Sequence, residues 1–186
     1  MTPVAANKAI FLDRDGTLIY DKHYLSDPAD VEVIPGVGEA LQKALNMGYA
    51  LFLFSNQSGV GRGYFTLDAV GFCNQRMVEL MGFAQSPFLE TCLADEAPDQ
   101  PIVYRKPSPK FIYEMIAQYQ LDTTKSYMVG DKVCDWEAGI RADIQSVAVQ
   151  TGKPFPANSA EFLQTHNVPV YHSVVEWIAA LSRSGF

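Results

Sequence analysis

The chain has 186 residues, of which 48% are hydrophobic and 12% aromatic, enough to fill the core of one domain. Its formal net charge of −7 disfavours a protein that lives on nucleic acid or on an anionic membrane, because such surfaces are bound by basic proteins. No apolar run approaches the roughly 20 residues of a membrane helix, and residues 1–8 lack the features of a signal peptide, so we expect a cytoplasmic protein with no membrane partner.

Short apolar runs alternate with amphipathic stretches along the chain, which is typical of a parallel sheet with helices on both faces. The expected strands are residues 9–12, 49–54, 87–92, 126–129, 146–149 and 168–171. The expected helices are residues 37–47, 67–81, 107–119, 132–141, 157–165 and 174–182. We therefore expect one α/β domain over residues 1–186, with a doubly wound, Rossmann-like sheet.

The cysteines offer no framework for the fold. Cys73, Cys92 and Cys134 are odd in number and are not closely paired. This usage predicts reduced, mostly buried thiols rather than disulfides or a complete metal site.

The first expected strand runs directly into Asp13-Arg14-Asp15-Gly16. Residues two apart on a strand project the same way, so Asp13 and Asp15 can converge on one ion at its carboxyl end, where open α/β sheets bind ligands. Magnesium-dependent phosphoryl transfer needs such a pair of carboxylates. An ordinary Asp-Gly turn that closes a strand would contain the same residues.

Three more polar clusters follow expected strands or precede expected helices. Residues 55–59 (Ser-Asn-Gln-Ser-Gly) can cradle phosphate oxygens with side-chain and backbone donors. Arg105 and Lys106 precede a helix start, where the helix dipole favours an anion. Asp131 and Asp135 follow a strand and lie one helical turn apart. Taken alone, each cluster is equally compatible with a turn, a solvated cation pair or a helix cap.

Together these residues resemble the four motifs of the haloacid-dehalogenase-like (HAD) hydrolase superfamily, in the order that the superfamily has them. The motifs are Asp13-Arg14-Asp15, Ser55, Lys106, and Asp131 with Asp135. From about Ile10 to Lys153 the chain is similar to the small phosphatases that act on heptose bisphosphate and histidinol phosphate. The resemblance implies a HAD-like fold. The short spans between the motifs leave no room for a separate cap domain, so we expect an open site.

The resemblance implies a magnesium-dependent phosphatase that works through an aspartyl-phosphate. Asp13 would be the nucleophile, and Asp15 would be the general acid and base. Ser55 and Lys106 would stabilise the transferring phosphate. The implied Mg²⁺ ligands are Asp13, Asp15 through its backbone carbonyl, and Asp131, with Asp135 in an outer shell.

The implied substrate is a small phosphorylated metabolite. Its expected contacts are Asp21, Lys22, His23, Tyr24, Asn56, Gln57, Ser58, Arg105 and Lys132. Arg105 is the main specificity residue, since a guanidinium can grip a second phosphate bidentately. Relatives that cleave histidinol phosphate tend to have Asp where Ser58 stands. We therefore expect hydrolysis of the 7-phosphate of D-glycero-D-manno-heptose 1,7-bisphosphate, with histidinol phosphate as the alternative substrate.

Other classes of protein share some or all of these residues. A non-catalytic phospho-ligand binding protein could retain every one of these residues. A dehalogenase would have no use for Asp15 as a proton donor, and a nucleic-acid 3′-phosphatase conflicts with the acidic charge. We expect a monomer with no nucleic-acid partner.

One departure from the related bacterial phosphatases concerns zinc. These carry a zinc-binding loop of cysteines and a histidine just before the Arg-Lys pair. Here only Cys92 stands at a matching place, with Ala94, Ile102 and Tyr104 where other ligands would fall. Four-coordinate zinc cannot be built from one thiol. We expect that zinc is absent and that packing of Ile102 and Tyr104 positions Arg105.

Overall fold

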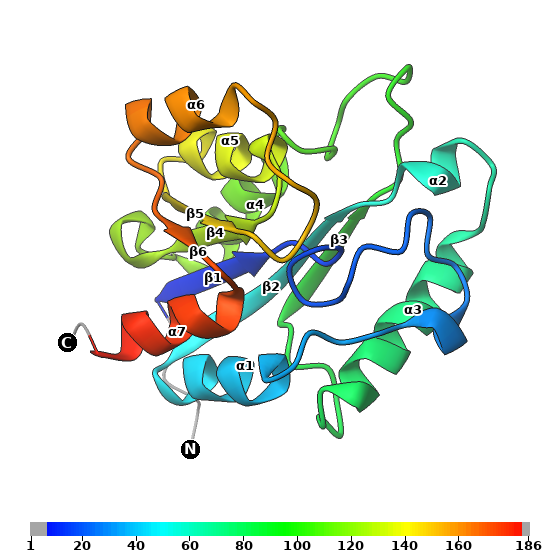
Figure 1. Ribbon diagram of the computed structural model, residues 1–186, viewed down its shortest axis with the longest axis horizontal. Helices are drawn as coiled ribbons and strands as arrows, with labels where there is room; N and C mark the ends of the chain where they lie inside the picture. The colour runs from blue at the N-terminus through cyan, green and yellow to red at the C-terminus, as the bar shows by residue number, and fades with distance from the viewer. Residues whose placement is uncertain (1–6, 184–186) are drawn as a thin grey trace.

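The computed structural model describes residues 7–183, in which six parallel strands form one sheet of order β3-β2-β1-β4-β5-β6 (Figure 1). The strands are β1 (Lys8–Leu12), β2 (Tyr49–Asn56), β3 (Glu90–Ala94), β4 (Tyr127–Gly130), β5 (Gln145–Val149) and β6 (Val170–Tyr171). The helices are α1 (Val37–Asn46), α2 (Ser58–Gly61), α3 (Leu67–Leu80), α4 (Lys110–Tyr119), α5 (Val133–Arg141), α6 (Ser159–Thr165) and α7 (Val174–Arg183), with short 3-10 turns η1 (Pro28–Asp30) and η2 (Thr123–Lys125). The expected doubly wound α/β architecture is confirmed.

Successive side chains of each strand enter cores on opposite faces of the sheet. On β1, Ile10 and Leu12 pack with α1, α3 and α7, while Ala9 and Phe11 pack with α4 and α5. A smaller cluster around Trp136 joins α5, α6 and β5. Because strands β1, β2 and β4 are buried on both faces, they are continuously apolar in sequence.

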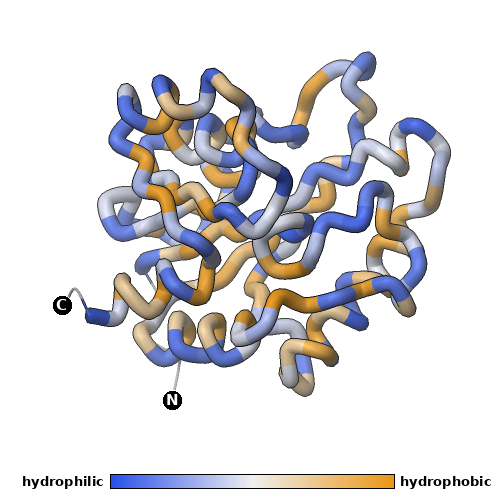
Figure 2. The backbone as a smooth tube through the Cα atoms, viewed as in Figure 1, coloured by the Kyte–Doolittle hydropathy of each residue, from blue (hydrophilic) through white to orange (hydrophobic). Residues whose placement is uncertain are grey.

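Helix α1 illustrates how local pattern selects a face. Val37, Ala40, Leu41 and Ala44 repeat at helical spacing and are all buried. Along this helix, at the bottom of Figure 2, hydrophilic and hydrophobic residues alternate accordingly. The helix ends at Asn46, two residues before Gly48, whose φ of 83° few residues other than glycine adopt.

Two expected elements begin later than the sequence pattern indicates. The third strand starts at Glu90 rather than at residue 87. Helix α4 starts at Lys110 rather than at residue 107. Ser108 precedes Pro109, and the residue before a proline is disfavoured from helical geometry, which opposes a helix start before Pro109.

The spans between the sequence motifs pack on the sheet. The connection from β1 to β2 contains α1, and the connection from β2 to β3 contains α3, and both helices contribute to the core. Within the described residues, both helices therefore belong to the layer that covers one face of the sheet.

The strand order places two neighbouring strand ends at the point where the winding of the sheet reverses. From β1 the chain proceeds to β2 and β3 on one side, and β4 to β6 lie on the other. Connections that leave in opposite directions open a crevice at the carboxyl ends of the two central strands, β1 and β4. Asp13 follows β1 and Asp131 follows β4, so the fold brings both to this crevice.

Candidate active site

Lys106 lies at the centre of the site, buried with 2% of its surface exposed. Its Nζ lies 2.7 Å from Oδ1 of Asp13 and 2.7 Å from Oδ1 of Asp135, and it donates a hydrogen bond of 2.6 Å to the carbonyl of Phe54. Burial raises the pKa of Asp13, but Lys106 and then Lys132 outweigh burial and hold it below its usual value. Asp13 is therefore an ionised carboxylate beside a buried ammonium group.

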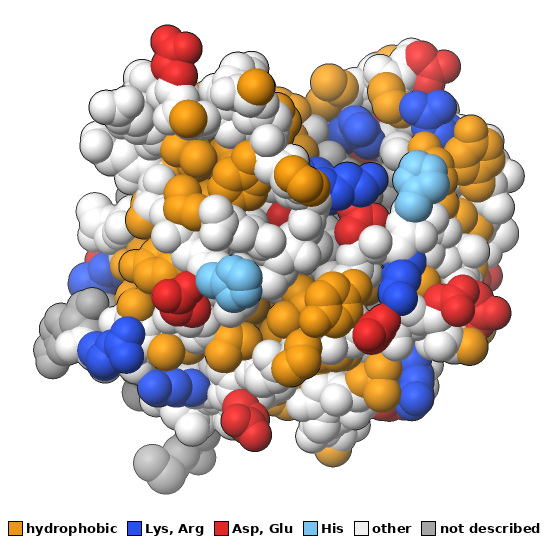
Figure 3. Space-filling view, in the orientation of Figure 1, with side chains coloured by type: hydrophobic (Ala, Val, Ile, Leu, Met, Phe, Trp, Pro, Cys, Tyr) orange, Lys and Arg blue, Asp and Glu red, His pale blue; other side chains and the backbone are white. Residues whose placement is uncertain are grey.

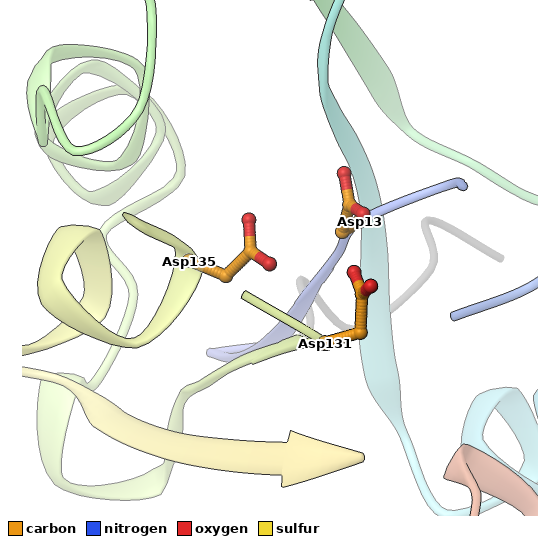
Figure 4. A group of neighbouring side chains, drawn as sticks. All are labelled: Asp13, Asp131 and Asp135. Carbon is orange, nitrogen blue, oxygen red and sulfur yellow. The ribbon is translucent and has the colours of Figure 1, made fainter. Parts of the chain in front are cut away.

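Asp131 completes a group of three carboxylates at the strand ends. One oxygen from each of Asp13, Asp131 and Asp135 lies within 4.8 Å of the others, and Figure 4 shows the three side chains around one space. Burial, and then the charges of Asp13 and Asp135, raise the pKa of Asp131 to about 8. Its Oδ2 is buried and has no hydrogen-bond partner among the described residues. This cluster can hold a hard cation through oxygen ligands.

A positive charge already lies against two of the expected metal ligands. Nζ of Lys132 is 3.2 Å from the backbone carbonyl oxygen of Asp15 and 3.2 Å from Oδ1 of Asp131. These two oxygens therefore face one cation, and they are two of the ligands that the family resemblance implies for Mg²⁺. Together with the unpaired Oδ2 of Asp131, this arrangement fits the donor set of a magnesium site.

Asp15 is held by Arg14, which the sequence analysis did not identify as a site residue, and by Gln57, which it expected to contact the substrate instead. Arg14, 1% exposed, donates to both of its carboxylate oxygens, at 3.0 and 3.1 Å, and also to Oδ1 of Asn74 on α3 at 2.9 Å. Nε2 of Gln57 donates to Oδ2 of Asp15 at 3.0 Å and to Oγ of Ser55 at 2.8 Å. The carboxyl of Asp15 is thus bound by the side chains of Arg14 and Gln57, while its backbone carbonyl faces the ammonium group of Lys132.

The two amide side chains at the end of β2, Asn56 and Gln57, have different roles. Gln57 links Ser55 to Asp15, as described above. Asn56 instead binds the backbone of Lys106, accepting from its N–H at 2.8 Å and donating to its carbonyl at 3.1 Å. This paired contact fixes the loop from which the Lys106 side chain reaches Asp13.

Two adjoining hollows, each about 200 Å³, open over these groups. One is lined by Asp13, Arg105, Lys106, Cys134 and Asp135, and the other by Asp21, His23, Tyr24, Gln57, Phe65 and Lys153. Asp15, Asn56, Ser58 and Lys132 line both. In Figure 3, basic, acidic and histidine side chains gather around a hollow at the upper right. A further hollow of about 280 Å³ between α3 and β3 is mostly apolar, and none of Asp13, Asp131 and Asp135 lines it.

The structure brings most of the expected substrate contacts together, with one exception. Asp21, His23, Tyr24, Asn56, Gln57, Ser58, Arg105 and Lys132 all line one of these hollows. Lys22 lies outside both, and its Nζ pairs with Glu32 at 2.7 Å. Its role as a substrate contact stays a prediction without structural support.

The expected packing around Arg105 is wrong for one of its two residues. Ile102 is 60% exposed and does not pack against the core. Tyr104 packs at the edge of the core formed with α4, and its hydroxyl donates to Glu114 at 3.2 Å. The polar loop around Ile102 is held by hydrogen bonds, so it does not require an apolar anchor there.

Arg14, Asn74 and Lys153 are site residues that the sequence analysis missed. Lys153, which follows β5, lies 3.8 Å from Oδ2 of Asp21 and lines the second hollow. The one sequence signal for Arg14 was a charged residue between two acids at a strand end. Asn74 had none, because it is separated from Arg14 by 60 residues.

Comparisons with known proteins show the family to which the chain belongs. A family model described as HAD-hydrolase-like matches residues 103–177. The D-glycero-beta-D-manno-heptose-1,7-bisphosphate 7-phosphatase of Helicobacter pylori strain J99 is 31% identical over 179 residues, 94% of this chain and 99% of the relative. The protein of the same name from Haemophilus influenzae is 40% identical over 157 residues, 80% of this chain and 84% of the relative.

A solved structure supports the fold. The D,D-heptose 1,7-bisphosphate phosphatase from B. bronchiseptica, in complex with magnesium and phosphate, matches with a TM-score of 0.83. The match covers 96% of this chain and 99% of that chain at 23% identity. At this identity the likeness concerns the fold alone.

Proposed function

Because the chain belongs to the haloacid-dehalogenase-like hydrolases, and among them to the family of the heptose-1,7-bisphosphate 7-phosphatases, we propose that it releases the 7-phosphate of D-glycero-D-manno-heptose 1,7-bisphosphate. It is a phosphoric monoester hydrolase. The observation that carries the proposal is the buried contact of 2.7 Å between Lys106 and Asp13, beside Asp131, at the ends of β1 and β4.

Asp13 is the proposed nucleophile. Its lowered pKa leaves it ionised at neutral pH, so it can attack phosphorus and form an aspartyl-phosphate that water then cleaves. Lys106 touches the same carboxylate and offsets the negative charge that gathers when a phosphate approaches. The hydroxyl of Ser55 is the proposed partner of a phosphoryl oxygen.

Asp15 is the proposed general acid and base. Because its backbone carbonyl, and not its carboxyl, faces Lys132, the carboxyl is not needed as a metal ligand and would protonate the leaving alkoxide and later take a proton from water. Arg14 and Gln57 hold that carboxyl in one orientation. A group that transfers a proton in both half-reactions has to be held in the right position relative to the leaving group and the water.

Mg²⁺ would be held by Asp13, the carbonyl of Asp15 and Asp131, with Asp135 nearby. When bound, it supplies charge neutralisation at the phosphate oxygens. Asp135 also accepts from the backbone N–H of Lys132 at 2.9 Å and pairs with Lys106, which supports an outer position for it. Lys132 would then turn from the two oxygens that it touches toward the substrate.

The substrate contacts divide between the two hollows. We assign the second phosphate of the substrate to Arg105, which lines the same hollow as Asp13. The sugar would lie toward His23 and Tyr24, which line the other hollow. Ser58 lines both hollows and is the residue that favours the sugar over histidinol phosphate.

The partner of this site is a small phosphorylated metabolite, and we expect a cytoplasmic monomer. None of the helices in residues 7–183 has both the length and the apolar character needed to cross a bilayer.

Steady-state kinetics test the proposal. Rates of phosphate release are measured on heptose 1,7-bisphosphate and on histidinol phosphate, each with Mg²⁺ and with EDTA. We expect kcat/KM to favour the bisphosphate and to vanish without Mg²⁺. A preference for histidinol phosphate would overturn the substrate assignment, and binding of either compound without turnover would favour a phospho-ligand binding protein.

A further inference from the structure

The loop before Arg105 is organised by one carboxylate. Oε1 of Glu96 accepts hydrogen bonds from the backbone N–H groups of Val103 at 2.9 Å, Tyr104 at 2.6 Å and Arg105 at 3.3 Å. Three successive amides that point at one oxygen form a concave anion site, and here the protein's own side chain fills it. The segment that carries Arg105 is therefore tied to Glu96.

Glu96 also holds the side chain of Arg105. Its backbone carbonyl accepts from Nη1 of Arg105 at 3.3 Å. The same residue thus contacts Arg105 at the backbone and at the guanidinium, which removes freedom from both ends of a long side chain. Because this side chain loses rotamer freedom when the protein folds, less conformational entropy is lost when it binds a phosphate.

The other side of the loop is packed against α2. The N–H of Gly61 donates to the carbonyl of Asp95 at 2.9 Å. A Cβ at Gly61 would meet that carbonyl at 2.5 Å and Oε1 of Gln100 at 2.7 Å, so only glycine lets the two segments approach this closely. The backbone next to Glu96 is therefore held in place against α2, which follows β2.

The electrostatics of Glu96 agree with an anion in this position. Burial raises its pKa, but hydrogen bonds from the backbone N–H groups of Tyr104, Glu96 itself, Val103 and Arg105 outweigh burial, and the pKa lies below its usual value. The second carboxylate oxygen is buried without a hydrogen-bond partner among the described residues. Residues 90–106 contain one cysteine and no histidine, so they lack the set of thiolate and imidazole ligands with which a structural zinc ion could organise the loop instead.

We propose that Glu96 is a positioning residue that orients Arg105 toward the second phosphate of the substrate and so sets selectivity for a bisphosphate. This inference rests on the proposed function. The role differs from a purely structural one, because substituting Glu96 should lower the activity on the bisphosphate only while Arg105 is present.

A double-mutant cycle tests this. Wild type, Glu96→Ala, Arg105→Ala and the double variant are compared on heptose 1,7-bisphosphate and on the 7-monophosphate of the same heptose. Asp99→Ala, which changes an exposed acid of the same loop, is the matched control. We expect Glu96→Ala to lower kcat/KM for the bisphosphate about 10- to 100-fold, as loss of a charged hydrogen-bond group does, with a smaller loss on the monophosphate. In a protein that already carries Arg105→Ala, adding Glu96→Ala should lower kcat/KM for the bisphosphate by less than about threefold.

Amide hydrogen exchange gives a readout that does not depend on turnover. The N–H groups of Val103, Tyr104 and Arg105 should exchange at least about tenfold faster in Glu96→Ala than in wild type or Asp99→Ala. Unchanged exchange, an undiminished loss on the Arg105→Ala background, or faster exchange with unchanged selectivity would each overturn the proposal. Wild-type rates judge the proposed substrate separately. If the wild type rejects the bisphosphate, the proposed function and the selectivity role of Glu96 both fall, while the exchange rates still show whether Glu96 holds the loop.

Discussion

The guanidinium of Arg14 grips both carboxylate oxygens of Asp15, with Nε 3.0 Å from Oδ2 and Nη2 3.1 Å from Oδ1. Arg14 is buried, so its charge depends on this carboxylate for compensation, and its Nη1 donates a further hydrogen bond to Asn74. These two sequence neighbours thus have different roles: Asp15 faces the site, and Arg14 orients the carboxylate of Asp15.

Arg14→Lys should therefore impair proton transfer, because lysine keeps the charge but loses the fork that binds two oxygens. We expect kcat/KM for a sugar phosphate to fall about 10- to 100-fold, since a general acid acts through its placement. p-Nitrophenyl phosphate, whose leaving group needs no proton, should lose much less. Asn74→Ala, the milder control, should show the same trend, and equal losses on both substrates would contradict a positioning role.

Asp13→Asn should abolish turnover, with a loss of at least about 10⁴-fold, because an amide cannot attack phosphorus. Lys106 would keep its contact with Asp135 in this variant, so we expect a cooperative thermal unfolding transition close to that of the wild type. Phosphate release at the wild-type rate would refute Asp13 as the nucleophile.

Lys106→Ala should destabilise the protein by about 3–5 kcal/mol at pH 7, because it leaves Asp13 and Asp135 buried without their cation. Urea unfolding at pH 7 and at pH 5 measures this loss, which should be smaller at pH 5, where the carboxylates can take up protons. Adding Asp13→Asn should restore part of the stability. A loss that does not change with pH would argue against a charge effect.

Magnesium affinity should rise with pH. The pKa of Asp131 in the folded, metal-free protein is raised to about 8 by burial and by Asp13 and Asp135. Because this value lies above the ordinary one of about 3.9, the stability that the bound proton contributes is complete below about pH 4 and is lost as pH rises through about 8. Mg²⁺ must displace that proton, so its affinity should increase by up to about tenfold per pH unit between pH 6 and 8 and then level off.

Titration calorimetry in two buffers of different ionisation enthalpy measures the protons released with Mg²⁺. Close to one should leave at pH 7 and almost none at pH 9. Asp131→Asn serves as the control that removes the titrating ligand. An affinity for Mg²⁺ that is flat over this pH range would contradict the role of Asp131.

Metal analysis of the purified protein should find less than about 0.1 zinc per chain. Cys92 is the one cysteine within residues 90–106, and burial raises its pKa to about 12, which disfavours the thiolate that zinc needs. Treatment with EDTA should remove activity, and Mg²⁺ alone should restore it. Stoichiometric zinc would overturn this expectation.

Local sequence pattern determined the order of strands and helices, because the repeats of apolar residues, such as those in α1 and β2, record which faces are buried. It also placed Asp13, Ser55 and Asp131 close together, since the carboxyl ends of parallel strands share one edge of the sheet. Boundaries next to prolines, as at Lys110, were less well predicted.

Tertiary structure alone decided which groups hold the site residues in place. Arg14 meets Asn74 across 60 residues, Lys132 reaches the carbonyl of Asp15 across 117, and Glu96 closes on Arg105 across nine residues of irregular loop. No periodic pattern encodes such contacts, because a hydrogen bond depends on where two backbones come together and not on the residues beside either partner. The sequence thus indicated the reaction, and the fold selected the side chains that orient its groups.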